Sequence, residues 1–201
     1  AQSYPKIRLI VVDATTTSLL PQVAAGRLDC AVVNLPVNDP DVDTETLFSE
    51  DAIVVAPLDH PIAEHDEISL EQLAAHPVLL GPTGTSFRDS IDAAAKSRGV
   101  ELATLAEVDG MRLLASLAFQ GYGAAVLPAS AAPRTSTGEW KRVRLGGVTP
   151  REVGLATSRR TSPPAPARAV RDSIRAVVKA SGPEQPGVHV MQQGDANARS
   201  R

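Results

Sequence analysis

Short apolar runs alternate with amphipathic stretches along most of the chain. Near the start, Ile7–Val12 is apolar and rich in β-branched residues, which predicts a strand. The hydroxyl residues Thr15–Ser18 offer N-cap oxygens for a helix, whose apolar positions recur at helical spacing until Gly26 ends it. Asp29–Asn34 is again a short apolar run. Two buried strands joined by a helix predict parallel pairing through a right-handed crossover.

The rest of the chain continues this alternation. The further predicted strands are Asp51–Ala56, Val78–Leu80, Leu102–Val108, Ala124–Leu127, Val143–Leu145 and Glu152–Thr157, and the further predicted helices are Ser69–Ala74, Phe87–Arg98, Met111–Gln120 and Ala165–Ala180. The first of these helices begins at Ser69 and carries Gln72 three residues later, which is the pattern of a capping box. After Ser181 the chain is polar and rich in Gly, Gln and Pro, and residues 183–201 are predicted to be a disordered tail.

Two β/α units joined by single strands predict an α/β fold with two small subdomains. In sheets of this kind the ligand crevice lies outside the carboxyl ends of the strands. Thr15–Ser18 and Thr83–Ser86 occupy that place in the two units, each as a strand-to-helix turn. The pattern alone therefore indicates two polar segments at the mouth of a ligand site.

Composition places the chain among globular proteins and excludes several classes. Of its 201 residues, 43% are hydrophobic and 21% are charged, the balance of a folded chain. No apolar run approaches the roughly 20 residues of a membrane helix, and the first residues show no signal-peptide core. Cys30 is the single cysteine, which excludes an internal disulfide framework and favours a reducing, cytoplasmic compartment. Because Cys30 lies in an apolar run, we expect an inert core thiol.

Charge is distributed unevenly. Up to Pro133 there are 7 Lys and Arg against 18 Asp and Glu, and from Arg134 onward there are 13 against 5. A basic half can indicate nucleic-acid binding. These Arg residues are scattered, however, and only Trp140 among them offers an aromatic ring for base stacking. Two halves that fold together and compensate each other's charge are the simpler interpretation.

The sequence carries no recognisable catalytic, metal or cofactor motif. The loop Gly81–Ser86 lacks the Lys of a phosphate-binding loop, and Gly121-Tyr122-Gly123 leads into a strand instead of a helix. The four histidines, His60, His65, His76 and His189, have no Cys or second His at metal-ligand spacing. No Gly-x-Ser-x-Gly elbow supports a Ser–His–Asp triad. We therefore expect a binding protein without metal or cofactor, and not an enzyme.

The order and spacing of several segments resemble the effector-binding domain of LysR-type transcriptional regulators. The resemblance covers about residues 4 to 180. It rests on Tyr4–Leu9, Ala25–Val33, Leu47–Asp51, Val54–Pro57, Asp59–Ala63, Ser69–Ala74, Glu107–Asp109 and the closing motif Gly121–Pro128.

The resemblance implies the fold of type-2 periplasmic binding proteins, with two subdomains joined by two crossover strands. The first subdomain would comprise 1–78 and 156–182 and the second 79–155, with crossovers near 78–81 and 153–157. A small metabolite would bind in the cleft and shift the arrangement of an oligomer on promoter DNA. A periplasmic-type solute-binding protein of the same fold is the alternative, and a small enzyme on this fold is a third reading.

The chain departs from the family pattern at its start. Members begin with a winged helix-turn-helix and a linker helix, which are absent here, so promoter DNA would be reached only through a domain that this chain lacks. By comparison with the family pattern, we also expect the first strand of the effector domain to be missing before Tyr4-Pro5, as in a truncated chain. Unpaired backbone beside a sheet is costly and invites pairing with another chain. We therefore expect marginal stability or aggregation.

Site residues follow from the strand-to-helix turns and the implied fold together. The expected effector-binding residues are Thr15, Thr16, Thr17, Ser18, Asn34, Pro36, Thr83, Thr85, Ser86, Phe87, Val108 and Asp109. Hydroxyls and free backbone N–H groups at helix N-termini select an anion, so the expected effector is a small carboxylate-bearing metabolite. The alternative that these Thr and Ser side chains only cap their helices stays open.

The helix at 18–25 is implicated in self-association. In the resemblance, this helix of one chain packs beside the second subdomain of its partner in a two-fold dimer, and a full-length regulator would form tetramers. Leu19, Leu20 and Val23 are more apolar than one small subdomain needs on a single helix. They are therefore the expected dimer interface.

Overall fold

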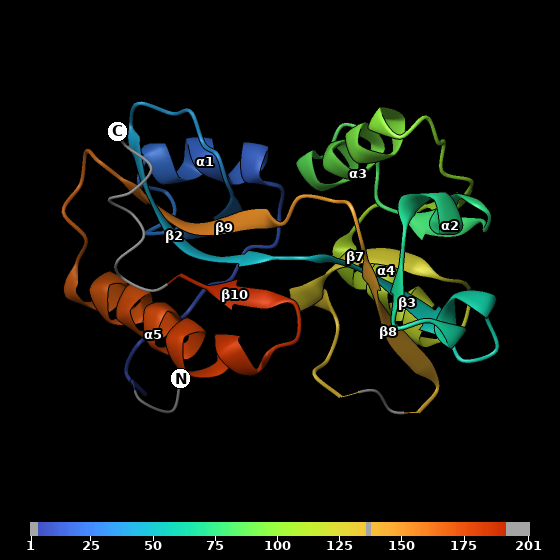
Figure 1. The fold of residues 1–201 in the computed structure, drawn as a ribbon. Coiled ribbons are helices and arrows are strands. Elements are labelled where there is room, and N and C mark those ends of the chain that lie inside the picture. Colours follow the sequence, from blue (N-terminus) through green and yellow to red (C-terminus); the bar gives the residue numbers. More distant parts are fainter. Residues whose placement is uncertain (1–3, 136–137, 192–201) are drawn as a thin grey trace. The chain divides into compact units, whose positions relative to one another are not determined.

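The computed structural model describes residues 4–135 and 138–191. Contacts within the chain divide it into two units (Figure 1). The first unit comprises Ala1–Phe48, Glu152–Ser181 and Val190–Arg201, and the second comprises Ser49–Arg151 and Gly182–His189. These limits differ from the expected boundaries at 78 and 156. They differ because the strand that begins at Ala52 pairs inside the second unit.

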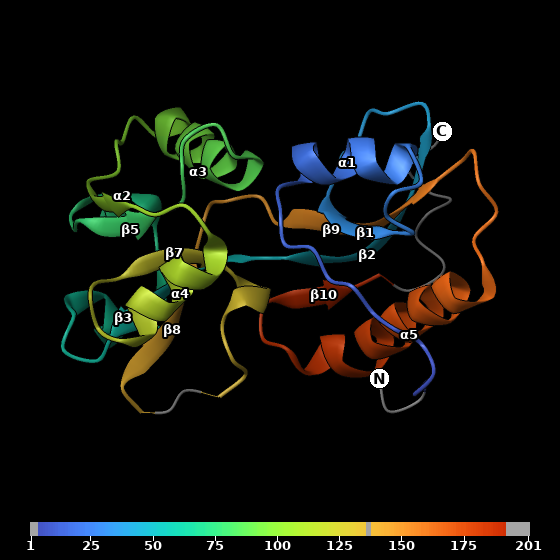
Figure 2. The ribbon, with the colours of Figure 1, turned by 180° about the vertical axis from the view of Figure 1, so that it is seen from behind.

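The first unit is built on a four-stranded sheet in the order β1-β9-β2-β10. The strands of this sheet are β1 (Ala31–Asn34), β9 (Arg151–Ser158), β2 (Val42–Glu50) and β10 (Val188–Val190), of which β10 belongs mostly to the second unit. The helices of the first unit are α1 (Thr16–Ala24) and α5 (Ala165–Ser181). The helices lie on opposite faces of this sheet (Figure 2). Leu19 and Val23 of α1 pack on Ala31, Val33 and Ala156 of the strands below.

The predicted strand at Ile7–Val12 is wrong, and so is its parallel pairing with the strand at Asp29–Asn34. Ile7–Val12 belongs to no helix or strand, and Leu9 to Val12 are all exposed. β1 pairs instead with β9, antiparallel, with Ala31 opposite Ala156. β propensity describes how well a residue fits a pleated, half-buried surface. Without a hydrogen-bonded neighbour, the apolar run at Ile7–Val12 does not become a strand.

The second unit holds a six-stranded sheet in the order β4-β8-β3-β7-β5-β6. Its strands are β3 (Ala52–Pro57), β4 (Glu67–Ile68), β5 (Val78–Leu80), β6 (Thr104–Glu107), β7 (Ala125–Pro128) and β8 (Trp140–Leu145), and its α-helices are α2 (Leu70–Ala74), α3 (Ser86–Ser97) and α4 (Met111–Phe119). β5 runs parallel to both β6 and β7, whereas β3 is antiparallel to β7 and β8.

Alternating residues of the central strands point to the two faces of this sheet. Val54 packs in one core with Ile91 and Ala95 of α3, and its neighbour Val55 packs in another with Leu114 of α4. α3 and α4 therefore cover opposite faces. The predicted capping box at the start of α2 is confirmed, with Ser69 and Gln72 each bonded to the other's backbone N–H.

The expectation of a disordered tail from residue 183 is wrong for its first part. A 3-10 turn, η3 (Gly182–Glu184), and β10 follow α5. Arg142 of β8 donates to the carbonyl oxygens of Pro186 (2.7 Å) and Ala129 (3.1 Å) and so holds this segment on the second unit. Backbone and guanidinium bonds, which composition does not reveal, order these residues. Residues 192–201 of the expected tail lie outside the described part of the chain.

Two smaller features complete the fold. Cys30 precedes β1 instead of lying within a strand, and its side chain is only half buried, so the expected core position is wrong. Desolvation at this position raises the pKa of the Cys30 thiol. In the residues that the structure describes, no helix is both long and apolar enough to span a bilayer.

Candidate functional site

The carboxyl ends of β5 and β6 lie at the same edge of the second sheet. The strands are parallel, and the backbone N–H of Val108 donates to the carbonyl of Leu80 at 2.9 Å just beyond them. The chain leaves β5 for α3 on one face and leaves β6 for α4 on the other. Open α/β sheets bind ligands outside the carboxyl ends of their strands, near the point where the strand order reverses. Here the order reverses at β5, which lies between β6 and β7. We call the loops after β5 and β6 the switch point.

Six of the predicted site residues meet at this switch point. They are Thr83, Thr85, Ser86 and Phe87 after β5, and Val108 and Asp109 after β6. Thr83 and Asp109 are exposed, whereas Val108 is only 8% exposed. The side chain of Val108 therefore contributes more to the core than to a ligand.

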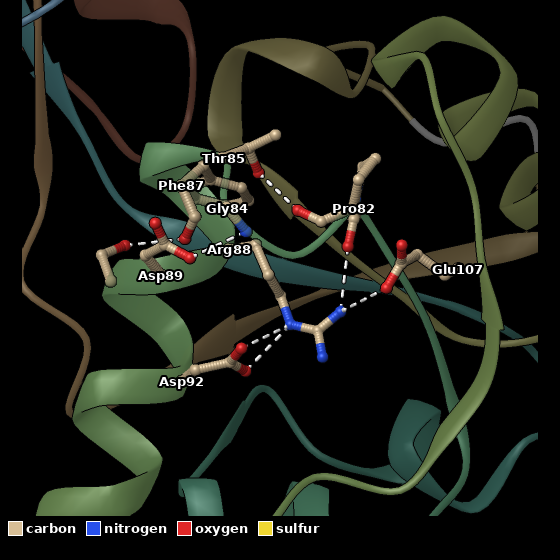
Figure 3. A network of polar contacts seen from close by, with 10 residues as sticks. Pro82, Gly84, Thr85, Phe87, Arg88, Asp89, Asp92 and Glu107 are labelled. Atoms are coloured by element: carbon tan, nitrogen blue, oxygen red, sulfur yellow. Dashed lines mark hydrogen bonds and ion pairs between the residues drawn. The ribbon is translucent and has the colours of Figure 1, made fainter.

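The N-terminus of α3 has no side-chain cap. Thr85 stands at the N-cap position, but its hydroxyl donates to the carbonyl oxygen of Pro82 at 2.8 Å (Figure 3). Within the described residues, no protein acceptor is assigned to the backbone N–H of Phe87 or Arg88. The capping alternative therefore does not account for Thr85, and the first turn keeps N–H groups for a ligand.

The N-terminus of α4 is similar. Gly110 is its N-cap, with φ at +99°, a conformation that L side chains rarely adopt. Glycine has no side chain that could cap the helix, and no other side chain caps α4. Two helices thus begin at one switch point without side-chain caps, and their aligned peptide dipoles favour negative charge there.

Arg88 contacts both the loop after β5 and the end of β6. Its side chain is 10% exposed, and its Nε lies 2.9 Å from both carboxylate oxygens of Asp92 (Figure 3). Its Nη1 donates to the carbonyl of Gly81 at 2.9 Å and lies 3.8 Å from Glu107. The guanidinium is thus occupied by the protein and positions the loop after β5. The ion pair between Arg88 and Asp92 could have been found in the sequence, because oppositely charged residues four positions apart on a helix lie side by side.

Acidic side chains surround the switch point. Asp89 in the first turn of α3 accepts from the backbone N–H of Gly84 at 3.1 Å, and Glu107 and Asp109 flank the end of β6. Like charges weaken anion binding. Any attraction of this site for an anion must therefore come from backbone N–H groups and helix dipoles.

Phe87 connects the switch point to a buried ion pair. The guanidinium carbon of Arg151 lies 5.2 Å from the centre of the Phe87 ring, within cation–π range. Arg151 also pairs with Glu50, whose side chain is fully buried. Sequence reasoning missed both residues, because they are 101 positions apart and no local pattern links them.

The polar segment of the first unit is organised differently. Thr15 caps α1, accepting from the N–H of Ser18 at 3.4 Å, and its hydroxyl lies 2.9 Å from that of Thr17. Thr16 Oγ1 accepts from the N–H of Asn34 at 3.1 Å. Pro36 is exposed and follows a cis peptide bond. Here the capping interpretation accounts for Thr15, and the hydroxyls bond mostly to the protein itself.

The expected dimer residues face the interior of their own unit. Leu19 is 7% exposed and Val23 is fully buried, and Leu20 is half buried against the same core. Side chains this buried offer little surface to a second chain. Self-association through Leu19, Leu20 and Val23 stays a prediction.

Histidines give no sign of a metal centre. Among the described residues, no group of three or more His, Cys, Asp or Glu side chains is placed to hold a metal ion. His60 and His76 lie edge to face, with ring centres 5.3 Å apart. Desolvation, followed by the charge of His76, lowers the pKa of His60.

The family of LysR substrate-binding domains matches residues 1–179. The chain belongs to this family. Among curated proteins it is 31% identical over 129 residues to a probable hydrogen peroxide-inducible genes activator of Streptomyces viridosporus, covering 64% of this chain and 41% of that protein. It is 27% identical over 132 residues to the DNA-binding transcriptional dual regulator OxyR of Escherichia coli, covering 66% and 43%. The chain thus spans less than half the length of these relatives.

Solved structures show the same fold. The effector-binding domain of QuiR in complex with shikimate superposes with a TM-score of 0.68 at 20% identity, covering 83% of this chain and 79% of that one. The BenM effector-binding domain with its effector benzoate gives 0.71 at 20% identity, covering 90% and 83%. The LysR substrate-binding domain therefore has the type-2 periplasmic-binding-protein-like fold that the sequence resemblance implied.

Proposed function

We propose that this chain is the ligand-sensing domain of a LysR-type regulator and binds a small carboxylate metabolite at the switch point of β5 and β6. The observation that carries the proposal is the N-terminus of α3, where Thr85 leaves the first-turn N–H groups without a side-chain cap. A carboxylate is an acceptor that such N–H groups bind well. The similar domains of QuiR and BenM were solved with shikimate and benzoate, both organic acids.

The site residues have binding roles in this proposal. N–H groups of the first turns of α3 and α4 hold the carboxylate, and the exposed Thr83 offers a hydroxyl for another polar group of the effector. Arg88 fixes the loop without touching the ligand. The roles expected for Thr15–Ser18 and Asn34 stay predictions. The effector then shifts an oligomer whose contact with promoter DNA is made by another domain.

The relatives are named as activators of peroxide-inducible genes, but the thiol of this chain does not suit a reaction with peroxide. A thiol that reacts with peroxide needs thiolate character and exposure. Cys30 is the single cysteine of the chain, it is half buried, and burial raises the pKa of its thiol. A raised pKa disfavours the thiolate, so Cys30 is poorly suited to sense peroxide.

Calorimetric titration with benzoate and shikimate tests the proposal, with benzamide as the uncharged analogue of benzoate. In Thr85→Asp, an aspartate at the N-cap accepts from one first-turn N–H group and adds a negative charge that repels an anion. We expect the variant to fold at least as stably as wild type and to lose acid binding. Ser69→Asp makes the same change at the cap of α2 and should bind like wild type.

The outcomes separate clearly. Acid binding that survives in Thr85→Asp would place the site elsewhere. Equal binding of benzamide and benzoate would contradict a carboxylate effector. Failure of wild type to bind any acid in a panel of small organic acids would contradict the proposed ligand class.

A further inference from the structure

The segment after α5 leaves the first unit and lies on the second. Contacts within the chain assign Gly182–His189 to the second unit, although α5 before it and Val190 after it belong to the first. The chain therefore passes between the units twice within these residues, in addition to the passages that follow Phe48 and Arg151. We name Gly182–Val190 the C-terminal strap.

Polar side chains of the strap bind the second unit. Gln185 Nε2 donates to the carbonyl oxygens of Ala129 at 3.1 Å and Ala132 at 2.8 Å. The neighbouring Glu184 forms an ion pair with Arg134. These partners lie between β7 and β8, about 50 residues away from the strap in the sequence. Two consecutive side chains of the strap are thus committed to one loop of the second unit.

Arg142 of β8 holds the strap from the side of the second unit. Its guanidinium donates to the carbonyl of Pro186 in the strap at 2.7 Å. The same group donates to the carbonyls of Ala132 at 3.0 Å and Pro133 at 2.9 Å. A guanidinium carries five N–H donors in a fixed plane, so it can bind several carbonyl oxygens at once. Arg142 therefore fixes the strap and the loop between β7 and β8 to each other.

The strap approaches the second unit most closely at Gly187. This residue has φ at +77°, and a Cβ there would lie 2.9 Å from the Cβ of Ala129. Its carbonyl oxygen accepts from the backbone N–H of Asp51 at 2.8 Å. The carboxylate Oδ1 of Asp51 lies 3.0 Å from Nε2 of His189. Both the backbone and the side chain of Asp51 are therefore bound to the strap.

These contacts lie beside the first passage between the units. The chain passes to the second unit after Phe48, and β2 ends at Glu50. β10 of the strap is hydrogen-bonded to β2, and Asp51, the next residue along the chain, is bound to Gly187 and His189. Domain movements are absorbed as changes in φ and ψ at a few residues of such connections. A segment bonded to the chain around this point opposes those changes, because its hydrogen bonds would have to break.

We propose that the C-terminal strap is a splint for the passage from β2 to β3, and that it restrains the movement of the two units relative to each other. Units joined by a few single segments usually move against each other unless something holds them. The strap supplies such a restraint, and it needs no effector. One consequence rests on the proposed function: a splinted passage limits the arrangements among which an effector selects.

Hydrogen exchange of backbone N–H groups tests whether the strap is docked. In wild type the N–H of Asp51 should be protected by its bond to Gly187. The strap variant carries Glu184→Ala, Gln185→Ala and Gly187→Val, which remove two anchors and add a clash without changing the residues that they contact. In this variant Asp51 should lose its protection, whereas the N–H groups within β3 keep theirs. An Asp51 that is unprotected in wild type, or equally protected in both proteins, would overturn the proposal.

Distances between spin labels test whether the docked strap restrains the units. Ala176→Cys on α5 and Ala93→Cys on α3 place one label on each unit at exposed residues, and Cys30→Ser removes the native thiol. Pulsed electron paramagnetic resonance without effector should give a narrow distance distribution with the wild-type strap and a broader one with the strap variant. Gly121→Val also adds a side chain at positive φ (+80°), but its Cβ meets no atom within 4 Å, and the distribution should stay narrow.

Equal widths with the wild-type strap and the strap variant would overturn the restraint, and so would equal broadening by Gly121→Val. No effector is present in either experiment. Their results therefore do not depend on whether the chain binds an organic acid, and a failure of the proposed function is detected separately by calorimetry.

Discussion

Arg151 donates to the carboxylate of Glu50 from two nitrogens, with Nε and Nη2 at 2.8 and 2.7 Å from Oε1. The backbone N–H of Ser130 donates to the other oxygen at 2.7 Å. Glu50 is the last residue of β2 and Arg151 the first of β9. The chain passes between its two units next to both residues. A buried ion pair thus fixes the two strands where they enter the second unit, and Phe87 joins it to the effector loop.

Breaking this pair should be costly. Glu50→Gln leaves Arg151 without its counter-charge, and removal of one partner of a buried pair destabilises by about 3–5 kcal/mol. We expect a loss toward the lower end of that range, because the Arg151 side chain is still 22% exposed. Urea unfolding measures it. Glu67→Gln removes the carboxylate from an exposed pair with Arg144 and should cost below about 1 kcal/mol. Equal losses in the two variants would contradict the structural role of Glu50.

Local signals in the sequence predicted local structure well. The capping box of Ser69 and Gln72 is encoded within four residues, and the structure contains it. The turns at Thr83–Ser86 and Val108–Asp109 were also predicted, because each follows a short apolar run. What brings these two turns together is the parallel pairing of β5 with β6, which follows from the alternation of strands and helices.

Features that depend on a distant partner could not be predicted in the same way. Ile7–Val12 has the composition of a strand, but a strand also needs a neighbour, and the sequence does not say whether one is present. The role of Thr85 depends on where its hydroxyl points, and Pro82 takes it away from the helix. The burial of Glu50 could not be predicted, because its partner Arg151 is distant in the sequence and only the fold brings the two together.

A glycine in β9 should tolerate no side chain. A Cβ on Gly154 would lie 2.9 Å from the carbonyl oxygen of Glu45 and 2.8 Å from Leu35 Cδ1. The carbonyl belongs to the backbone of the neighbouring strand and cannot move without disturbing the ladder. Gly154→Ala should therefore lower the free energy of unfolding by about 1–3 kcal/mol, the range for overpacking. In Gly81→Ala the new Cβ meets no atom within 4 Å, so thermal unfolding should show little change. A stable Gly154→Ala would refute the close packing.

His60 should make stability depend on pH in the mildly acidic range. Its Nδ1 accepts from the N–H of Ile62 at 3.2 Å, and desolvation lowers its pKa in the folded state. Because the unfolded chain then binds the proton more tightly, the His60 contribution is fully present above the unfolded pKa of about 6.5. It is lost as the pH falls from that value toward the lowered folded pKa.

The substitution His60→Asn tests this dependence. Asparagine keeps an acceptor at the cap of the turn but does not titrate. The variant should therefore lose part of the decline in unfolding free energy that wild type shows below about pH 6.5. His65→Asn, which changes an exposed histidine nearby, should keep that decline. If chemical denaturation at a series of pH values gave His60→Asn the same profile as wild type, His60 would not be its source.

Asp89 should weaken the binding of an acidic effector, a prediction that rests on the proposed function. Its carboxylate lies in the first turn of α3 and accepts from Gly84, close to the N–H groups assigned to the ligand. Asp89→Asn keeps an acceptor for Gly84 and removes the negative charge. Exposed charge pairs interact by about 0.2–1 kcal/mol, so removing this repulsion should raise the affinity for benzoate by up to about 5-fold. Glu101→Gln removes an exposed acid elsewhere in the second unit and should leave the affinity unchanged. Calorimetry at low salt gives the largest difference, because screening reduces it. Weaker benzoate binding in Asp89→Asn would mean that Asp89 contacts the effector directly, and it would exclude an anion held by the first turn of α3.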